Sequence, residues 1–154
     1  MHLPQNPFTR PARLFAGGLL VLASLPALSQ QDPLAHAAAE TGAVVTESGL
    51  VFRALVEGKG ASPSATDTVS VNYRGSFPDG REFDSSYKRG KPASFPLNRV
   101  IRCWTEGVQR MKVGGKAKLT CPAALAYGER GAGNVIPPNA VLKFEVELLG
   151  IGGQ

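Results

Sequence analysis

Strict alternation of apolar and polar side chains is the feature that most constrains the fold of this chain. A β-strand turns successive side chains to opposite faces, so a period of two marks a strand with one buried face. The pattern runs through residues 67–75, 116–121 and 140–151, and residues 49–56 are a further strand candidate. The sequence therefore predicts a sheet with one covered face. Its covered residues are expected to be Val69, Val71, Tyr73, Ala117, Leu119, Cys121, Ala140, Leu142, Phe144, Val146 and Leu148.

A tight turn is expected directly after the first of these alternating segments. Residues 78–81 read Pro-Asp-Gly-Arg. Gly80 tolerates a positive φ, and the Asp79 side chain can accept hydrogen bonds from the nearby backbone. Residues 81–86 would then return as the partner strand of a hairpin.

One helix is expected in the domain. Trp104, Val108 and Met111 recur at helical spacing, which predicts a helix over residues 104–111 with one apolar stripe. Gly114–Gly115 would end it. Many strands, tight turns and a single short helix indicate an α+β domain in which an antiparallel sheet packs on a helix.

The first 29 residues have the composition of a secretory signal peptide. Arg10 and Arg13 supply the positive charge, and residues 14–28 form an apolar run before a small-residue cleavage site. The run is shorter than the ~20 residues that a membrane-spanning helix needs. An uncleaved membrane anchor is the alternative. Cleavage would place a bacterial protein in the periplasm or outside the cell, with no membrane association left.

The rest of the chain reads as a short arm followed by one domain. Residues 30–45 are expected to be a flexible or partly helical arm, and residues 46–152 the domain. The whole chain carries 17 basic and 12 acidic residues, and loss of the leader would lower the net charge from +5 to +3. The basic residues are spread out, which argues against a nucleic-acid binder.

The two cysteines, Cys103 and Cys121, allow two interpretations. An oxidising compartment would permit a disulfide between them, which would stabilise the fold by roughly 3 kcal/mol. Two buried thiols are the alternative, because Cys121 falls on the apolar face of its strand. The sequence contains no CxxC pair.

Several kinds of catalytic site lack the residues they need. His2 would leave with the leader, and His36 lies in the arm, so a nucleophile-histidine arrangement has no base. Metal sites of the His/Cys kind lack ligands as well, and residues 110–117 do not match a phosphate-binding loop. We therefore expect no metal and no cofactor. An apolar pocket remains as the site that the sequence can build.

Five motifs, in order along the chain, resemble those of a known family. The chain is similar to the FKBP-type peptidyl-prolyl cis-trans isomerases, the tacrolimus-binding immunophilins, over roughly residues 46–152. The resemblance implies a five- to six-stranded antiparallel sheet wrapped around one short helix. The motifs are Val71-Asn72-Tyr73-Arg74-Gly75, Asp79-Gly80 followed by Phe83-Asp84-Ser85-Ser86, Val100-Ile101 before Trp104-Thr105-Glu106-Gly107, Ala126-Tyr127-Gly128, and Ile136-Pro137-Pro138-Asn139-Ala140.

The resemblance also implies roles for individual residues. Trp104 would be the pocket floor, Ile101 would offer its backbone N–H to the substrate, and Tyr127 would donate its hydroxyl to a substrate carbonyl. Asp84 would be a buried acid bonded to Tyr73 and paired with Arg89, orienting carbonyls rather than transferring protons. Catalysis would thus fall to Asp84, Tyr127, Phe144 and Tyr73, and substrate binding to Phe83, Arg89, Phe95, Val100, Ile101, Trp104 and Ile136.

Three positions depart from the pattern common in this family. Ala93 stands where many members have an aromatic residue, Ala132 where they have histidine, and Cys103 where they have glycine. The two alanines lie on the pocket rim in the family, so they are expected to alter ligand preference more than chemistry.

The function that the resemblance implies is rotation of X-Pro peptide bonds in folding periplasmic or secreted proteins. The expected partners are Pro-containing unfolded or partly folded polypeptides, and tacrolimus or rapamycin as possible inhibitors. The protein is expected to be a monomer. The alternative is a chaperone or partner-docking module that binds Pro-bearing segments without useful catalysis.

Overall fold

Two long antiparallel strands, β3 (Thr68–Ser76) and β7 (Leu142–Ile151), form the middle of the sheet. The computed structural model describes residues 31–152. Tyr73 pairs with Val146 in the register of these strands. Both strands alternate between buried and part-exposed positions for most of their length, which confirms the predicted strand period. The expected leader over residues 1–29 lies outside the described residues.

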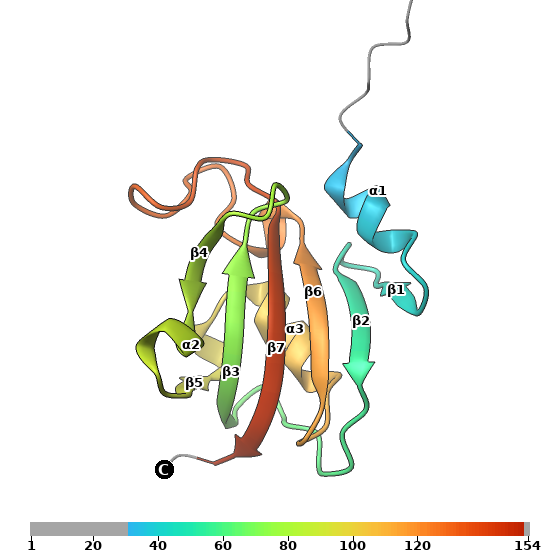
Figure 1. Cartoon of the computed structure of the whole chain (residues 1–154), viewed down its shortest axis with the longest axis vertical. Helices are drawn as coiled ribbons and strands as arrows, with labels where there is room; N and C mark the ends of the chain where they lie inside the picture. The colour runs from blue at the N-terminus through green and yellow to red at the C-terminus, as the bar shows by residue number, and fades with distance from the viewer. Residues whose placement is uncertain (1–30, 153–154) are drawn as a thin grey trace, which may run out of the picture. The chain divides into compact units, whose positions relative to one another are not determined.

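The sheet runs in the order β1-β2-β6-β7-β3-β4, and β5 pairs with β3 off this path (Figure 1). All its pairings are antiparallel. Among the described residues the sheet has seven strands, one more than the five to six strands that the family resemblance implied. The strands besides β3 and β7 are β1 (Ala43–Val45), β2 (Val51–Val56), β4 (Glu82–Ser85), β5 (Ala93–Pro96) and β6 (Lys116–Cys121).

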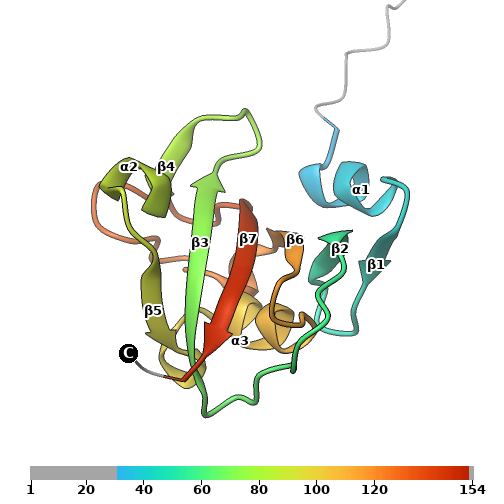
Figure 2. The same ribbon diagram turned by 60° about the horizontal axis from the view of Figure 1, so that its bottom comes forward.

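Helix α3 (Arg102–Gln109) packs against one face of the sheet, behind β6 and β7 in Figure 1 and below them in the rotated view of Figure 2. Trp104, Val108 and Met111 are all buried, as their spacing predicted. Gly107 lets the helix approach β6 closely, because a Cβ on it would lie 2.7 Å from a methyl carbon of Leu119.

The helix ends earlier than expected. Its last helical residue is Gln109, and the N–H of Met111 bonds to the carbonyl of Val108, which tightens the final turn. This tightening lets Met111 enter the core just past the helix. Gly114, with φ of +91°, instead serves the turn that leads into β6, so the prediction that Gly114–Gly115 ends the helix was wrong.

The segment expected as an arm contains a helix and a strand of the sheet. Helix α1 (Pro33–Ala38) begins at Asp32, whose carboxylate accepts a hydrogen bond from the Leu34 N–H. Strand β1 then pairs with β2 at the edge of the sheet. Between α1 and β1 lies Glu40, whose carboxylate accepts a hydrogen bond from Arg53 Nη1 at 2.5 Å. This part of the chain is thus joined to the sheet.

Short helical turns lie in three of the connections: between β4 and β5, between β5 and α3, and after β6. They are α2 (Ser86–Arg89), η1 (Leu97–Arg99) and η2 (Ala123–Leu125). The long connection from β6 to β7 projects beyond the ends of the strands, near β4 (Figure 1). Within residues 31–152, none of the helices has the length and apolar character needed to cross a membrane.

Candidate active site

A pocket of about 510 Å³ opens between the sheet, α3 and the connections around them. Its lining is largely aromatic and aliphatic, with charged side chains from only two residues among the described lining. The lining residues come from strands β3, β4, β5 and β7, from helix α3, and from the two connections β5–α3 and β6–β7, so the fold assembles them from distant parts of the chain. They are Tyr73, Phe83, Asp84, Phe95, Arg99, Val100, Ile101, Trp104, Tyr127 and Phe144.

Trp104 is the centre of an aromatic cluster in this pocket. Its ring makes edge-to-face contacts with Tyr73, Phe95 and Phe144 at centroid distances of 5.1, 5.5 and 5.5 Å. Phe83 continues the cluster by packing edge-on against Phe144. Edge-to-face pairs favour fixed ring orientations. The cluster therefore gives the pocket rigid walls.

Gly75 provides the space for two of these rings. It lies opposite Phe144 in the register of β3 and β7. A Cβ on Gly75 would lie 2.6 Å from the Phe83 ring and 3.0 Å from the Phe144 ring. Glycine at this position thus allows both aromatic side chains to pack over the strand.

The carboxylate of Asp84 is held by a closed set of hydrogen bonds. The Tyr73 hydroxyl donates to Oδ2 at 2.5 Å, and Arg89 Nη1 donates to Oδ1 at 2.6 Å. Arg89 Nη2 also donates to the Tyr73 hydroxyl oxygen at 2.8 Å, and the Ser85 N–H donates to Oδ1. Both contacts expected for Asp84 are therefore present in the structure.

These contacts decide the charge state of the network. Partial burial acts to raise the pKa of Asp84, but the hydrogen bond from Tyr73 and the hydrogen bond and charge of Arg89 outweigh it and lower that pKa below its usual value. Burial and the neighbouring carboxylate raise the pKa of Tyr73. At neutral pH Asp84 is thus an acceptor without a proton, and it cannot donate a hydrogen bond to a substrate carbonyl.

Several donors at the pocket have no protein partner among the described residues, and the buried indole Nε1–H of Trp104 is one of them. Tyr127 lines the pocket and is exposed, and its hydroxyl makes no hydrogen bond within residues 31–152. The backbone N–H of Ile101, just before α3, also makes none within this range, while its carbonyl accepts from Trp104 and Thr105. Both groups are free to bind a carbonyl oxygen in the pocket.

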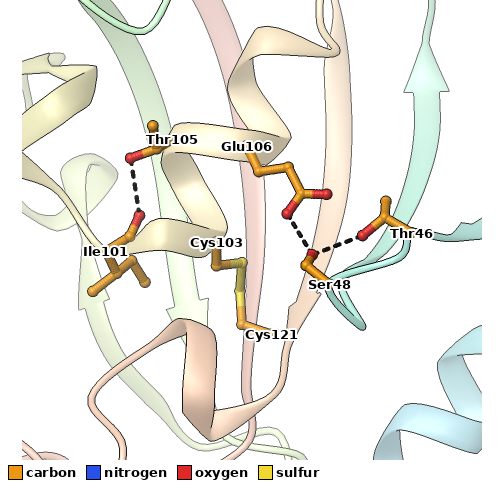
Figure 3. Close-up of a disulfide and its surroundings, with 7 residues drawn as sticks. All are labelled: Thr46, Ser48, Ile101, Cys103, Thr105, Glu106 and Cys121. Atoms are coloured by element: carbon orange, nitrogen blue, oxygen red, sulfur yellow. Dashed lines mark hydrogen bonds between the residues drawn. A yellow bond between two sulfur atoms is a disulfide. The ribbon is translucent and has the colours of Figure 1, made fainter.

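The helix that carries Trp104 is tied down beside the pocket. A disulfide joins Cys103 to Cys121 at the end of β6, which confirms the first of the two interpretations of these cysteines (Figure 3). About one turn further along the helix, the Ser48 hydroxyl donates to the Glu106 carboxylate at 2.5 Å (Figure 3). Trp104 therefore follows directly after a covalently anchored residue.

The structure brings together most, but not all, of the residues expected at the site. Ile136 is buried in the core and does not line the pocket. Arg89 lies behind the lining and reaches it only through Asp84 and Tyr73. Arg99 lines the pocket and was not expected there. It is an exposed polar residue in a turn, so no periodicity could have indicated it.

Within the part of the chain that the structure describes, no three His, Cys, Asp or Glu side chains gather as a possible metal site. The described lining of the pocket offers apolar walls, donors without a partner, the Asp84–Arg89 ion pair and the Arg99 cation.

Comparison with known proteins agrees with the fold. Residues 59–149 match the model of the FKBP-type peptidyl-prolyl cis-trans isomerase family. The chain is also similar to the crystal structure of FkpA from Escherichia coli, with a TM-score of 0.75 and 49% identity over 77% of this chain and 55% of that one. The chain belongs to the FKBP-type peptidyl-prolyl cis-trans isomerase family.

Two further relatives show how far the similarity extends. A peptidyl-prolyl cis-trans isomerase from Pseudomonas syringae has a TM-score of 0.73 and 37% identity, with 79% of this chain and 89% of that one covered. FkpA of Aeromonas hydrophila is 56% identical over 79% of this chain and 45% of its own length. The chain thus spans about half the length of the curated relatives it matches.

Proposed function

We propose that this protein is a peptidyl-prolyl cis-trans isomerase that accelerates rotation of X-Pro bonds in unfolded or partly folded polypeptides. The observation that carries the proposal is a rigid aromatic pocket that combines free hydrogen-bond donors with a single, fully engaged acid. Such a pocket suits a reaction that needs desolvation and shape but moves no proton. Family membership supports the same function.

The barrier to this reaction explains why such a pocket can catalyse it. Rotation of an X-Pro bond breaks amide resonance and has a barrier of ~18–20 kcal/mol. The planar amide is more polar than the twisted one, so transfer from water into an apolar pocket disfavours the planar form. Walls that fit the twisted form better than the planar form would lower the barrier further, because only differential binding accelerates a reaction.

The proposed roles follow from this mechanism. Trp104 supports the proline ring, and Phe144 and its neighbours form the walls. Tyr127 and the backbone N–H of Ile101 bind the carbonyl oxygens on either side of the rotating bond. Asp84, which has no proton to donate, acts indirectly by holding Tyr73 in place.

Substitution of Phe144 tests the pocket. Phe144→Ala should lower kcat/KM for a proline tetrapeptide by about tenfold or more, which corresponds to about 1.4 kcal/mol of lost transition-state binding. Phe144→Leu keeps more of the buried volume, so its kcat/KM should lie between those of the wild type and Phe144→Ala. Phe52→Ala is the matched control, because Phe52 packs against the core without lining the pocket.

A protease-free isomerisation assay is the appropriate measurement, with circular dichroism to show that each variant is folded. Equal kcat/KM values for folded Phe144→Ala and the wild type would refute the pocket assignment. Peptide binding without acceleration by the wild type would instead indicate a docking module. Binding can be followed by fluorescence, because Trp104 is the only tryptophan in the chain.

We also propose that tacrolimus and rapamycin bind in this pocket. The pocket volume suits a compact apolar group. Ala93 and Ala132, whose positions lie on the pocket rim in the family, carry less side chain than the aromatic residue and the histidine of many members. Titration of Trp104 fluorescence with either compound measures the affinity. Failure of both to change the fluorescence or inhibit turnover would contradict the proposal.

Export to the periplasm or beyond is the last part of the proposal. It is supported by the charged and then apolar pattern of the first 29 residues and by the disulfide, which forms in oxidising compartments. We expect the exported protein to be a monomer. Cell fractionation, the mass of the purified mature chain and its size in solution would test these points, and recovery of the uncleaved chain in the cytosol would contradict export.

A further inference from the structure

Arg99 is a cation at the pocket that the proposed mechanism does not use. It is the last residue of η1 (Leu97–Arg99), two positions before the free N–H of Ile101, and it lines the pocket. The turn that carries it is well anchored. Leu97 is fully buried, and its carbonyl accepts a hydrogen bond from the Thr105 hydroxyl at 2.5 Å. The backbone therefore presents Arg99 at a fixed place on the rim.

Among residues 31–152, no acidic side chain forms an ion pair that would balance the charge of Arg99. The other charged residue in the lining, Asp84, is already neutralised by Arg89 at 2.6 Å. The pocket thus offers a substrate one net positive charge. The guanidinium group is suited to a carboxylate, which it can bind through two parallel hydrogen bonds.

We propose that Arg99 selects proline segments that carry a glutamate or aspartate next to the proline. This inference rests on the proposed isomerase function and names the substrate class for the same pocket. The side chain of a residue beside the proline must leave the pocket over its rim. A substrate carboxylate at the rim is attracted by the Arg99 guanidinium, whereas a substrate lysine is repelled by it.

The size of the effect follows from the exposure of Arg99. Exposed ion pairs contribute about 0.2–1 kcal/mol, so the upper part of this range corresponds to a preference of roughly two- to fivefold in kcat/KM. Screening should reduce the preference at high salt, since the Debye length falls to about 3 Å at 1 M.

Pairs of proline tetrapeptides that differ only in Glu or Gln test the proposal. One pair places the residue before the proline and another places it after. Each is measured by protease-free isomerisation, because a coupling protease has its own charge preference. The proteins are the wild type, Arg99→Gln, Arg99→Glu and Arg102→Gln. Arg102 is the matched control: it is exposed and close in sequence but does not line the pocket.

We expect the wild type to prefer the Glu peptide in at least one pair. The ratio of kcat/KM for the Glu peptide to kcat/KM for the Gln peptide should fall to about one in Arg99→Gln and below one in Arg99→Glu. It should stay at the wild-type value in Arg102→Gln. Equal Glu and Gln values in the wild type for both pairs, or a preference that Arg99→Gln retains, would overturn the inference while leaving the isomerase proposal intact. Failure of the wild type to accelerate any of the peptides would overturn the isomerase proposal itself.

Discussion

Reduction of the disulfide between Cys103 and Cys121 should lower the free energy of unfolding by about 3 kcal/mol. The two residues are separated by 18 positions. In the chain-entropy description, opening a loop of this size releases that much conformational entropy to the unfolded state at 25 °C. With a urea m-value of about 1–3 kcal/mol/M, the unfolding midpoint should move down by between about 1 and 3 M.

Equilibrium urea unfolding with and without dithiothreitol measures the difference. Both half-cystines are fully buried, so the reductant should be added to the unfolded chain before refolding. The double variant Cys103→Ala/Cys121→Ala is the control, and its midpoint should not respond to dithiothreitol. A difference below about 1 kcal/mol in the wild type would show that the closed loop does not limit the unfolded state, and the entropic reasoning would fail.

Two more predictions follow from packing and from charge. Gly107→Ala should destabilise the domain by about 1–3 kcal/mol, because the new methyl group would overlap Leu119, whereas Gly150→Ala, which meets no atom within 4 Å, should be close to neutral in the same urea experiment. The lowered pKa of Asp84 stabilises the fold above the unfolded carboxyl pKa of about 3.9, and this contribution is lost as pH falls through the lower folded value. Thermal midpoints measured from pH 7 to pH 2 should therefore fall more steeply below pH 4 for the wild type than for Asp84→Asn, and parallel curves would contradict the assigned network.

The long strands could be predicted from the sequence because their pattern is local. Each of β3, β6 and β7 has enough residues to show a period of two, and the inward side chains are those that the period indicates. β1 and β5 have three and four residues, too few for a period. They are strands because their backbones pair with β2 and β3, respectively. These pairings depend on the tertiary fold and cannot be recognised from the local sequence.

The residues of the site also divide into those that the sequence could indicate and those that it could not. Alternation alone placed Tyr73 and Phe144 on the covered face, and the family resemblance supplied Phe83 and Tyr127. Arg99 had neither signal. It is exposed on a single 3₁₀ turn. Only the structure shows that it lines the pocket and that it forms no ion pair within residues 31–152.

The position of β7 has a consequence for how the domain is made. This last strand lies between β6 and β3, where Val69 pairs with Ile151 and Ser76 with Lys143. Partners so far apart along the chain make folding slow. As the chain is synthesised, the earlier strands emerge with the centre of their sheet vacant, so neither the sheet nor the wall that Phe144 supplies can be completed until residues 142–151 are available. Until then, the edges of β3 and β6 that β7 joins have no partner strand, so the domain reaches its folded state only after residues 142–151 have been synthesised.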